Sequence, residues 1–145
     1  MLMTPPPTDR AGSLDAAVRT WRTIGSPGFP FDEAKIRARA GRLFDRSFHP
    51  TGPARQLAAI LAHGDRTEKL RAVSAPTLVI HGAADPLVPL EGGRDTARAI
   101  PGAELLVIEG MGHDLPEGAW PQLVGAISEH TAKAEANRAQ AGART

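Results

Sequence analysis

Cysteine is absent from the 145-residue chain, and so are a charge excess and a long apolar run. Without cysteine there is no disulfide framework, no thiolate nucleophile and no cysteine-based zinc or iron–sulfur site. The 17 basic and 16 acidic side chains give a formal net charge of +1, which provides no electrostatic attraction for nucleic acid or an anionic membrane. No apolar segment approaches the roughly 20 residues that cross a bilayer, and the first residues lack a secretory signal pattern. We therefore expect a soluble, cytoplasmic protein that binds neither nucleic acid nor a membrane.

Apolar residues in the first half of the chain recur at the spacing that is typical of helices. Hydrophobic residues make up 41% of the composition, enough for a core in a domain of this length. Residues 1–12 contain Pro5-Pro6-Pro7 and few apolar side chains, and we expect them to form a flexible N-terminal segment. Apolar residues then recur at helical spacing in three segments. The predicted helices run from about Ser13 to Gly25, from an N-cap at Asp32 to Phe44, and from Pro53 to Ala62.

The second half predicts two parallel strands joined by a helix. Segments 76–82 (PTLVIHG) and 104–110 (ELLVIEG) are short apolar runs closed by glycine, which is typical of buried parallel strands. A helix from about Glu91 to Ala99 connects them, so the three elements form a βαβ unit with a right-handed crossover. A last helix is predicted from about Ala119 to His130. Residues 132–145 have little to pack, and we expect a flexible tail there.

Two polar residues follow the predicted strands at the edge where parallel sheets bind ligands. Asp85 lies in the loop after the first strand, and His113 lies in the loop after the second, with Gly110 and Gly112 allowing the sharp turn that presents it. A carboxylate in contact with an imidazole fixes its tautomer and stabilises the imidazolium, so the other ring nitrogen can take a proton from a hydroxyl nucleophile. We predict that the two side chains converge to about 2.6–3.2 Å.

Simpler roles compete for the neighbouring polar residues. Asp114 is better explained as a helix cap near Pro116 than as a catalytic acid. His81, inside an apolar strand, is better explained as a hydrogen-bonded core residue than as a ligand. The remaining histidines lie on predicted helix ends or surfaces and receive no function; they are His49, His63 and His130.

Two other kinds of site fit the sequence poorly. Gly110-Met-Gly begins like a dinucleotide-binding fingerprint, but Leu115 occupies the position of the third glycine and Pro116 follows it. The histidines and aspartates of the two loops do not have the one-turn helical spacing of known zinc motifs. We therefore expect neither a dinucleotide cofactor nor a metal.

The two loops resemble the acid-bearing and base-bearing segments of the α/β-hydrolases. The resemblance rests on segments 76–85 and 110–113, whose Asp85 and His113 are 28 residues apart. Segment 52–62, with the region from Trp21 to Phe48 before it, is most similar to the aclacinomycin-methylesterase-type branch. It implies a partial α/β-hydrolase fold, with a helical lid remnant and connecting helix over residues 13–63 and the C-terminal part of the core over 64–131. It also implies hydrolysis of esters or similar bonds through a serine acyl-enzyme, with Asp85 orienting the general base His113 and no cofactor.

The chain departs from this family at the nucleophile. The family carries a Gly-x-Ser-x-Gly elbow upstream of the acid, and none of the chain's serines lies in one; they are Ser13, Ser26, Ser47, Ser74 and Ser128. The segment most similar to such an elbow, Gly25-Ser26-Pro27-Gly28, follows a helix and contains a proline. The upstream His-Gly loop that supplies an oxyanion-hole N–H is missing too, since His81-Gly82 ends the acid strand. We therefore expect a C-terminal portion with acid and base but no nucleophile, inactive alone.

Three expectations about partners follow. Completion by an N-terminal half, as in a truncated or split hydrolase, would let the chain bind a small-molecule substrate, with Leu87, Val88 and Leu115 lining the pocket. A non-catalytic remnant or binding module is the alternative. In either case the strand left without its upstream neighbour would favour self-association through the unpaired sheet edge.

Overall fold

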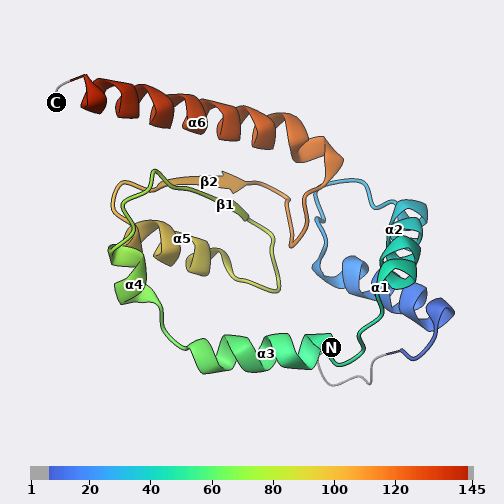
Figure 1. Ribbon diagram of the computed structural model, residues 1–145. Helices are drawn as coiled ribbons and strands as arrows, with labels where there is room; N and C mark the ends of the chain where they lie inside the picture. Colours follow the sequence, from blue (N-terminus) through green and yellow to red (C-terminus); the bar gives the residue numbers. More distant parts are fainter. Residues whose placement is uncertain (1–6, 144–145) are drawn as a thin grey trace. The chain divides into compact units, whose positions relative to one another are not determined.

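A computed structural model of the chain describes residues 7–143, which form two compact units. The first unit contains residues up to 25 together with Phe31–Arg66, and the second contains Ser26–Pro30 and the residues from Thr67 onward. The elements, labelled in Figure 1, are α1 (Arg10–Ile24), α2 (Glu33–Arg46), α3 (Gly52–His63), α4 (Thr67–Arg71), β1 (Leu78–Gly82), α5 (Leu90–Ala99), β2 (Glu104–Ile108), the short 3₁₀ helix η1 (Glu117–Ala119) and α6 (Trp120–Gly142). Within residues 7–143, no helix combines the length and apolar character needed to cross a bilayer.

Helix α1 begins earlier than its sequence pattern predicted. The Asp9 side chain accepts a hydrogen bond from the Gly12 N–H at 2.7 Å and caps the helix, which therefore starts at Arg10 instead of near Ser13. Residues 10–12 thus belong to α1 and not to a flexible segment. The rest of the expected N-terminal segment includes residues 1–6, which lie outside the described residues.

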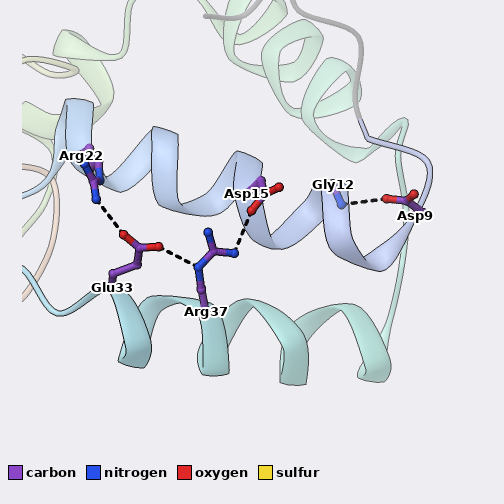
Figure 2. Close-up of polar contacts among 6 residues, drawn as sticks. All are labelled: Asp9, Gly12, Asp15, Arg22, Glu33 and Arg37. Carbon is purple, nitrogen blue, oxygen red and sulfur yellow. Dashed lines mark hydrogen bonds and ion pairs between the residues drawn. The ribbon is translucent and has the colours of Figure 1, made fainter.

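Helices α1 and α2 pack against each other and are joined by a chain of ion pairs (Figure 2). Arg22 contacts Glu33 at 2.7 Å, and Arg37 contacts both Glu33 and Asp15 at 2.8 Å. The two arginines lower the pKa of the Glu33 carboxyl through their hydrogen bonds. These side chains remain more than a third exposed, so solvent and salt weaken the pairs. The ion pairs therefore add little stability. Their main effect is to determine which faces of α1 and α2 contact each other.

Helix α3 covers the predicted segment but buries none of its residues within the unit. Pro53 lies in its first turn, as the sequence pattern predicted. Its apolar side chains are exposed, 38% for Leu57, 68% for Ile60 and 73% for Leu61. The helix therefore presents an apolar surface that the described part of its unit does not cover.

The second unit contains the expected parallel strand pair. Strands β1 and β2 pair in register from Leu78 opposite Glu104 to Gly82 opposite Ile108. Helices α5 and α6 lie on opposite faces of the two strands (Figure 1). The face toward α6 holds the core, in which Ile108, Met111, Ala119 and Leu123 are buried with Ile80 and Leu106 packed against them. On the other face, the ring of His81 packs so closely on Gly93 of α5 that a Cβ there would lie 2.6 Å from it.

Helix α6 is longer than its apolar pattern predicted. It continues from Trp120 to Gly142, where the sequence pattern predicted an end near His130 followed by a flexible tail. The residues of α6 beyond His130 are almost all exposed. They are rich in alanine, glutamate, lysine, arginine and glutamine, whose high helix propensity favours a helix even where it does not pack against other elements. A Glu129–Lys133 pair at 3.0 Å also supports it. Helix α4 is not indicated by the sequence pattern either, because five residues are too few to show a helical periodicity.

Candidate active site

Asp85 lies just beyond the carboxyl end of β1, in a loop that its own side chain closes. The Oδ1 atom accepts the backbone N–H of Leu87 at 2.8 Å and that of Val88 at 2.9 Å. Such a turn forms readily because an aspartate side chain can reach the N–H groups two and three residues later. Only 6% of the Asp85 side chain is exposed, so the carboxylate is fixed in position before any partner binds.

His113 lies beyond the carboxyl end of β2 and contacts the other carboxylate oxygen. Its Nδ1 is 2.8 Å from Asp85 Oδ2, inside the range that the sequence led us to expect. The turn that presents the imidazole uses Gly110, whose φ of +70° lies in the left-handed region that glycine tolerates. Because Oδ1 and Oδ2 face different donors, the carboxylate orients the imidazole without giving up its own anchoring bonds.

The two loops are also joined through their backbones. The Ala83 N–H donates to the Ile108 carbonyl at 3.0 Å, and the Ala84 N–H donates to the Met111 carbonyl at 2.9 Å. At Gly82 the approach is so close that a Cβ would lie 2.3 Å from the Met111 oxygen, which explains the glycine at the end of β1. These contacts hold together the loop after β1 that carries Asp85, here called the acid loop, and the loop after β2 that carries His113, here called the base loop.

The surroundings of Asp85 favour its ionised form. Burial opposes ionisation, but hydrogen bonds from the Val88 N–H, from His113 and from the Leu87 N–H outweigh it, so the pKa of Asp85 lies below its usual value. The carboxylate is therefore charged at neutral pH. A charged carboxylate favours the imidazole tautomer that carries its proton on Nδ1.

The second nitrogen of His113 is available for chemistry. The imidazole is 40% exposed, and among residues 7–143 Nε2 has no hydrogen-bond partner. A neutral imidazole held by Nδ1 carries its lone pair on Nε2 and can accept a proton there. Chemically, such an arrangement can serve as a general base with an orienting acid.

One serine contacts the base loop, and sequence reasoning missed this role. Ser26 Oγ accepts the N–H of Gly112 at 2.9 Å and donates to the Asp114 carboxylate. The sequence alone indicates Ser26 only as a poor nucleophile candidate and Asp114 as a helix cap. The cap assignment was wrong, because the N-cap residues of η1 and α6 are Pro116 and Ala119, and neither helix has a side-chain cap hydrogen bond. Nothing local in the sequence connects residues 86 positions apart.

The remaining candidates have varied surroundings. Leu87, Val88 and Leu115, the expected pocket residues, are 51%, 41% and 65% exposed.

His81 is partly buried, and its Nδ1 lies 2.9 Å from the Gly82 carbonyl oxygen, in agreement with a hydrogen-bonded core residue. His130, expected at a helix end or surface, lies within α6 with its side chain only 14% exposed and its Nδ1 3.8 Å from Glu104. In the described part of the chain, no three histidine or acidic side chains lie close enough to share a metal ion.

The chain matches the α/β-hydrolase family described as TAP-like protein (Abhydrolase_4) over residues 48–125. It belongs to that family. The match covers just over half of the chain and includes both Asp85 and His113. The fold agrees, since the structure superimposes with a TM-score of 0.67 on that of a serine hydrolase involved in carbazole degradation, the CarC enzyme. That likeness covers 90% of this chain and 50% of the CarC enzyme at 22% identity.

Two rhodomycin D methylesterases resemble this TAP-like α/β-hydrolase in sequence. It is 34% identical over 138 residues to DnrP of Streptomyces peucetius and 32% identical over 138 residues to DauP of Streptomyces sp. strain C5. Both matches cover 90% of this chain and 44% of the relative, so the chain spans less than half the length of either methylesterase. The chain is therefore a TAP-like α/β-hydrolase by family, with sequence similarity to methylesterases over part of their length.

Proposed function

We propose that this chain provides the acid and the base of a serine ester hydrolase of methylesterase type. The observation that carries the proposal is the 2.8 Å contact between His113 Nδ1 and Asp85 Oδ2, with Nε2 left without a partner among the described residues. In this role Asp85 orients the imidazole and stabilises its charged form, and His113 is the general base. Unit 1 then corresponds to the end of a lid and its connecting helix, and unit 2 to the C-terminal part of the hydrolase core.

The chemistry needs a serine hydroxyl opposite Nε2. His113 takes the hydroxyl proton as the serine oxygen attacks the ester carbonyl, and returns it to the departing alcohol as the acyl-enzyme forms. Water then attacks the acyl-enzyme in the same way, giving a carboxylic acid and regenerating the serine. No step requires a metal or an organic cofactor.

The nucleophile in this proposal comes from a polypeptide segment outside the 145 residues. The printed sequence contains no Gly-x-Ser-x-Gly elbow. Ser26 cannot substitute, because its hydroxyl proton is directed to Asp114 and its oxygen accepts the Gly112 N–H. The acid and base here are thus active only when such a segment completes the site.

A methyl ester of a small carboxylic acid is the substrate class that we propose. Two relatives that match 90% of the chain are named as rhodomycin D methylesterases. Leu87, Val88 and Leu115 offer exposed apolar surface beside the Asp85–His113 pair for the acyl part of such an ester. A small-molecule partner also suits the absence of a charge excess in the sequence.

A fusion protein tests the proposal directly. The part of DnrP that this chain does not match would be joined to the 145 residues, and methanol release from rhodomycin D would be measured. We expect turnover that His113→Ala lowers by at least about 10³-fold and Asp85→Ala by about 10²-fold or more, the range for removing members of a triad. His63→Ala, in α3 and exposed, is the matched histidine control and should leave turnover unchanged. Turnover that is indifferent to His113→Ala would refute the proposed role.

The missing elbow favours one other candidate, a non-catalytic remnant or binding module. The coding DNA on either side of the 145 codons discriminates between them. A contiguous or adjacent segment that encodes an elbow supports the completed hydrolase. Its absence, together with an inactive fusion protein, supports the remnant.

A further inference from the structure

The Ser26 hydroxyl binds both neighbours of His113 at once. Its oxygen accepts the Gly112 N–H at 2.9 Å, and its proton goes to the Asp114 carboxylate. Next to it, the Gly28 N–H donates to the Gly110 carbonyl at 2.9 Å. Segment 26–30 therefore holds the base loop at three points, before and after the imidazole.

This position requires a group that donates and accepts together. A hydroxyl does both, whereas an alanine in its place would leave the N–H of Gly112, a buried residue, without its acceptor. The partly buried Asp114 carboxylate would lose a charge-assisted hydrogen bond at the same time. Loss of both bonds frees the backbone on each side of His113.

We infer that Ser26 is a positioning residue for the base. By fixing residues 112 and 114 it fixes the backbone of His113 and aims Nδ1 at Asp85, so it acts through the histidine and does not touch the substrate. The inference rests on the proposed function, in which His113 is the general base. It also gives a physical reason why a short segment from the first third of the chain belongs to the second unit.

The tautomer of His113 measures this positioning. The bond to Asp85 favours the ring with its proton on Nδ1, and the ratio of the two neutral tautomers can be read from the nitrogen shifts of the ring by NMR. The full 145-residue chain would be labelled with ¹⁵N-histidine and studied at pH 9, well above the ordinary histidine pKa of about 6.5. Ser128→Ala, on the exposed face of α6, is the matched serine control.

We expect the Nδ1–H tautomer to dominate in the unmodified chain and in Ser128→Ala. In Ser26→Ala the ratio of Nδ1–H to Nε2–H should fall about tenfold, the factor for losing one hydrogen bond to a charged group. Ser26→Thr, which keeps the hydroxyl, should restore the ratio to within about threefold. A folded Ser26→Ala chain with an unchanged ratio overturns the inference and leaves the proposed function standing.

Two further outcomes are decisive. If the unmodified chain does not favour the Nδ1–H tautomer, the contact with Asp85 is absent and the inference fails together with the proposed function. If Ser26→Ala does not fold, Asp114→Ala decides, because it removes one anchor and keeps the Gly112 bond. A fall of about threefold in its ratio supports the inference, and an unchanged ratio overturns it.

Discussion

Asp85 and His113 meet through one carboxylate oxygen while the other is fully used by the backbone. Oδ2 lies 2.8 Å from His113 Nδ1, and Oδ1 accepts the N–H groups of Leu87 and Val88. The carboxylate thus cannot rotate away from the imidazole without breaking its two bonds to the backbone. The backbone of the acid loop therefore aligns Asp85 with His113. Because the N–H groups of this loop bind a charged carboxylate more strongly than a neutral one, the geometry of the pair depends on the ionisation of Asp85.

This arrangement predicts a specific dependence of stability on pH. The pKa of Asp85 is lower in the folded chain than in the unfolded one, so its contribution to the free energy of unfolding is complete above the ordinary value of about 3.9 and is lost as pH falls through the lower folded value. Asp85→Asn should therefore cost about 1–3 kcal/mol at pH 7 and flatten the loss of stability below about pH 4.

Urea unfolding between pH 3 and pH 8 checks this expectation. The fluorescence of Trp120 reports the second unit when Trp21, in the first, is replaced by phenylalanine. Asp95→Asn is the control, because that aspartate pairs with Arg98 at the exposed surface of α5. Parallel pH profiles for Asp85→Asn and the unmodified chain would contradict the stabilising role of the charge.

Ester hydrolysis by the isolated chain is the second prediction. Without an elbow among its 145 residues, the chain should cleave p-nitrophenyl acetate no faster than its own Asp85→Ala, His113→Ala variant, within about twofold. The two rates would be compared at equal protein concentration at pH 8. Turnover that His113→Ala alone abolishes would mean that another group in this chain is the nucleophile and would contradict the prediction.

The sequence was sufficient for the strands and for the dyad because both are local features. Each strand is a continuous apolar run, and Asp85 and His113 each follow a strand end, so parallel pairing brings their two loops to the same edge of the sheet. The role of Ser26 could not be predicted, because it depends on a tertiary contact across 86 residues. The end of α6 does not follow from its apolar stripe, because alanine-rich exposed segments form helix by propensity without an apolar face.

Self-association is the third prediction and concerns the free edge of β1. The Glu104 N–H donates to the Thr77 carbonyl and the Ala83 N–H to the Ile108 carbonyl, so alternate residues of β1, Leu78 and Ile80, direct their backbone groups away from β2. Within residues 7–143 no other strand pairs with them. An unpaired parallel edge favours association with a second copy.

Light scattering over a dilution series tests this. The mass of the isolated chain should exceed 15.3 kDa at micromolar concentration and fall on dilution. The DnrP fusion, whose added part would cover the edge, is the control and should stay monomeric. A chain that is monomeric throughout and unfolds in one sharp transition would show that the edge is protected.

Gly28 and Gly110 form a close backbone contact between segment 26–30 and the base loop. The Gly28 N–H donates to the Gly110 carbonyl at 2.9 Å, and a Cβ on Gly28 would lie 2.6 Å from the Gly110 Cα. The clash involves backbone on both sides, so no side chain can move to relieve it. Gly110 also has a φ of +70°, which adds strain for any other residue there.

The last prediction follows from this contact. Gly28→Ala should lower the free energy of unfolding of the second unit by about 1–3 kcal/mol, the usual cost of forcing a backbone shift in a packed region. Gly110→Ala should cost more, because it combines a Cβ 2.8 Å from the Gly28 Cα with about 1–2 kcal/mol for a left-handed residue. Gly125→Ala is the matched control: its Cβ meets nothing within 4 Å in α6, and the change should stabilise by about 0.5–1 kcal/mol. Urea unfolding followed by Trp120 fluorescence ranks the three. If Gly28→Ala were as well tolerated as Gly125→Ala, segment 26–30 would not be held against the base loop, and Ser26 could not position His113.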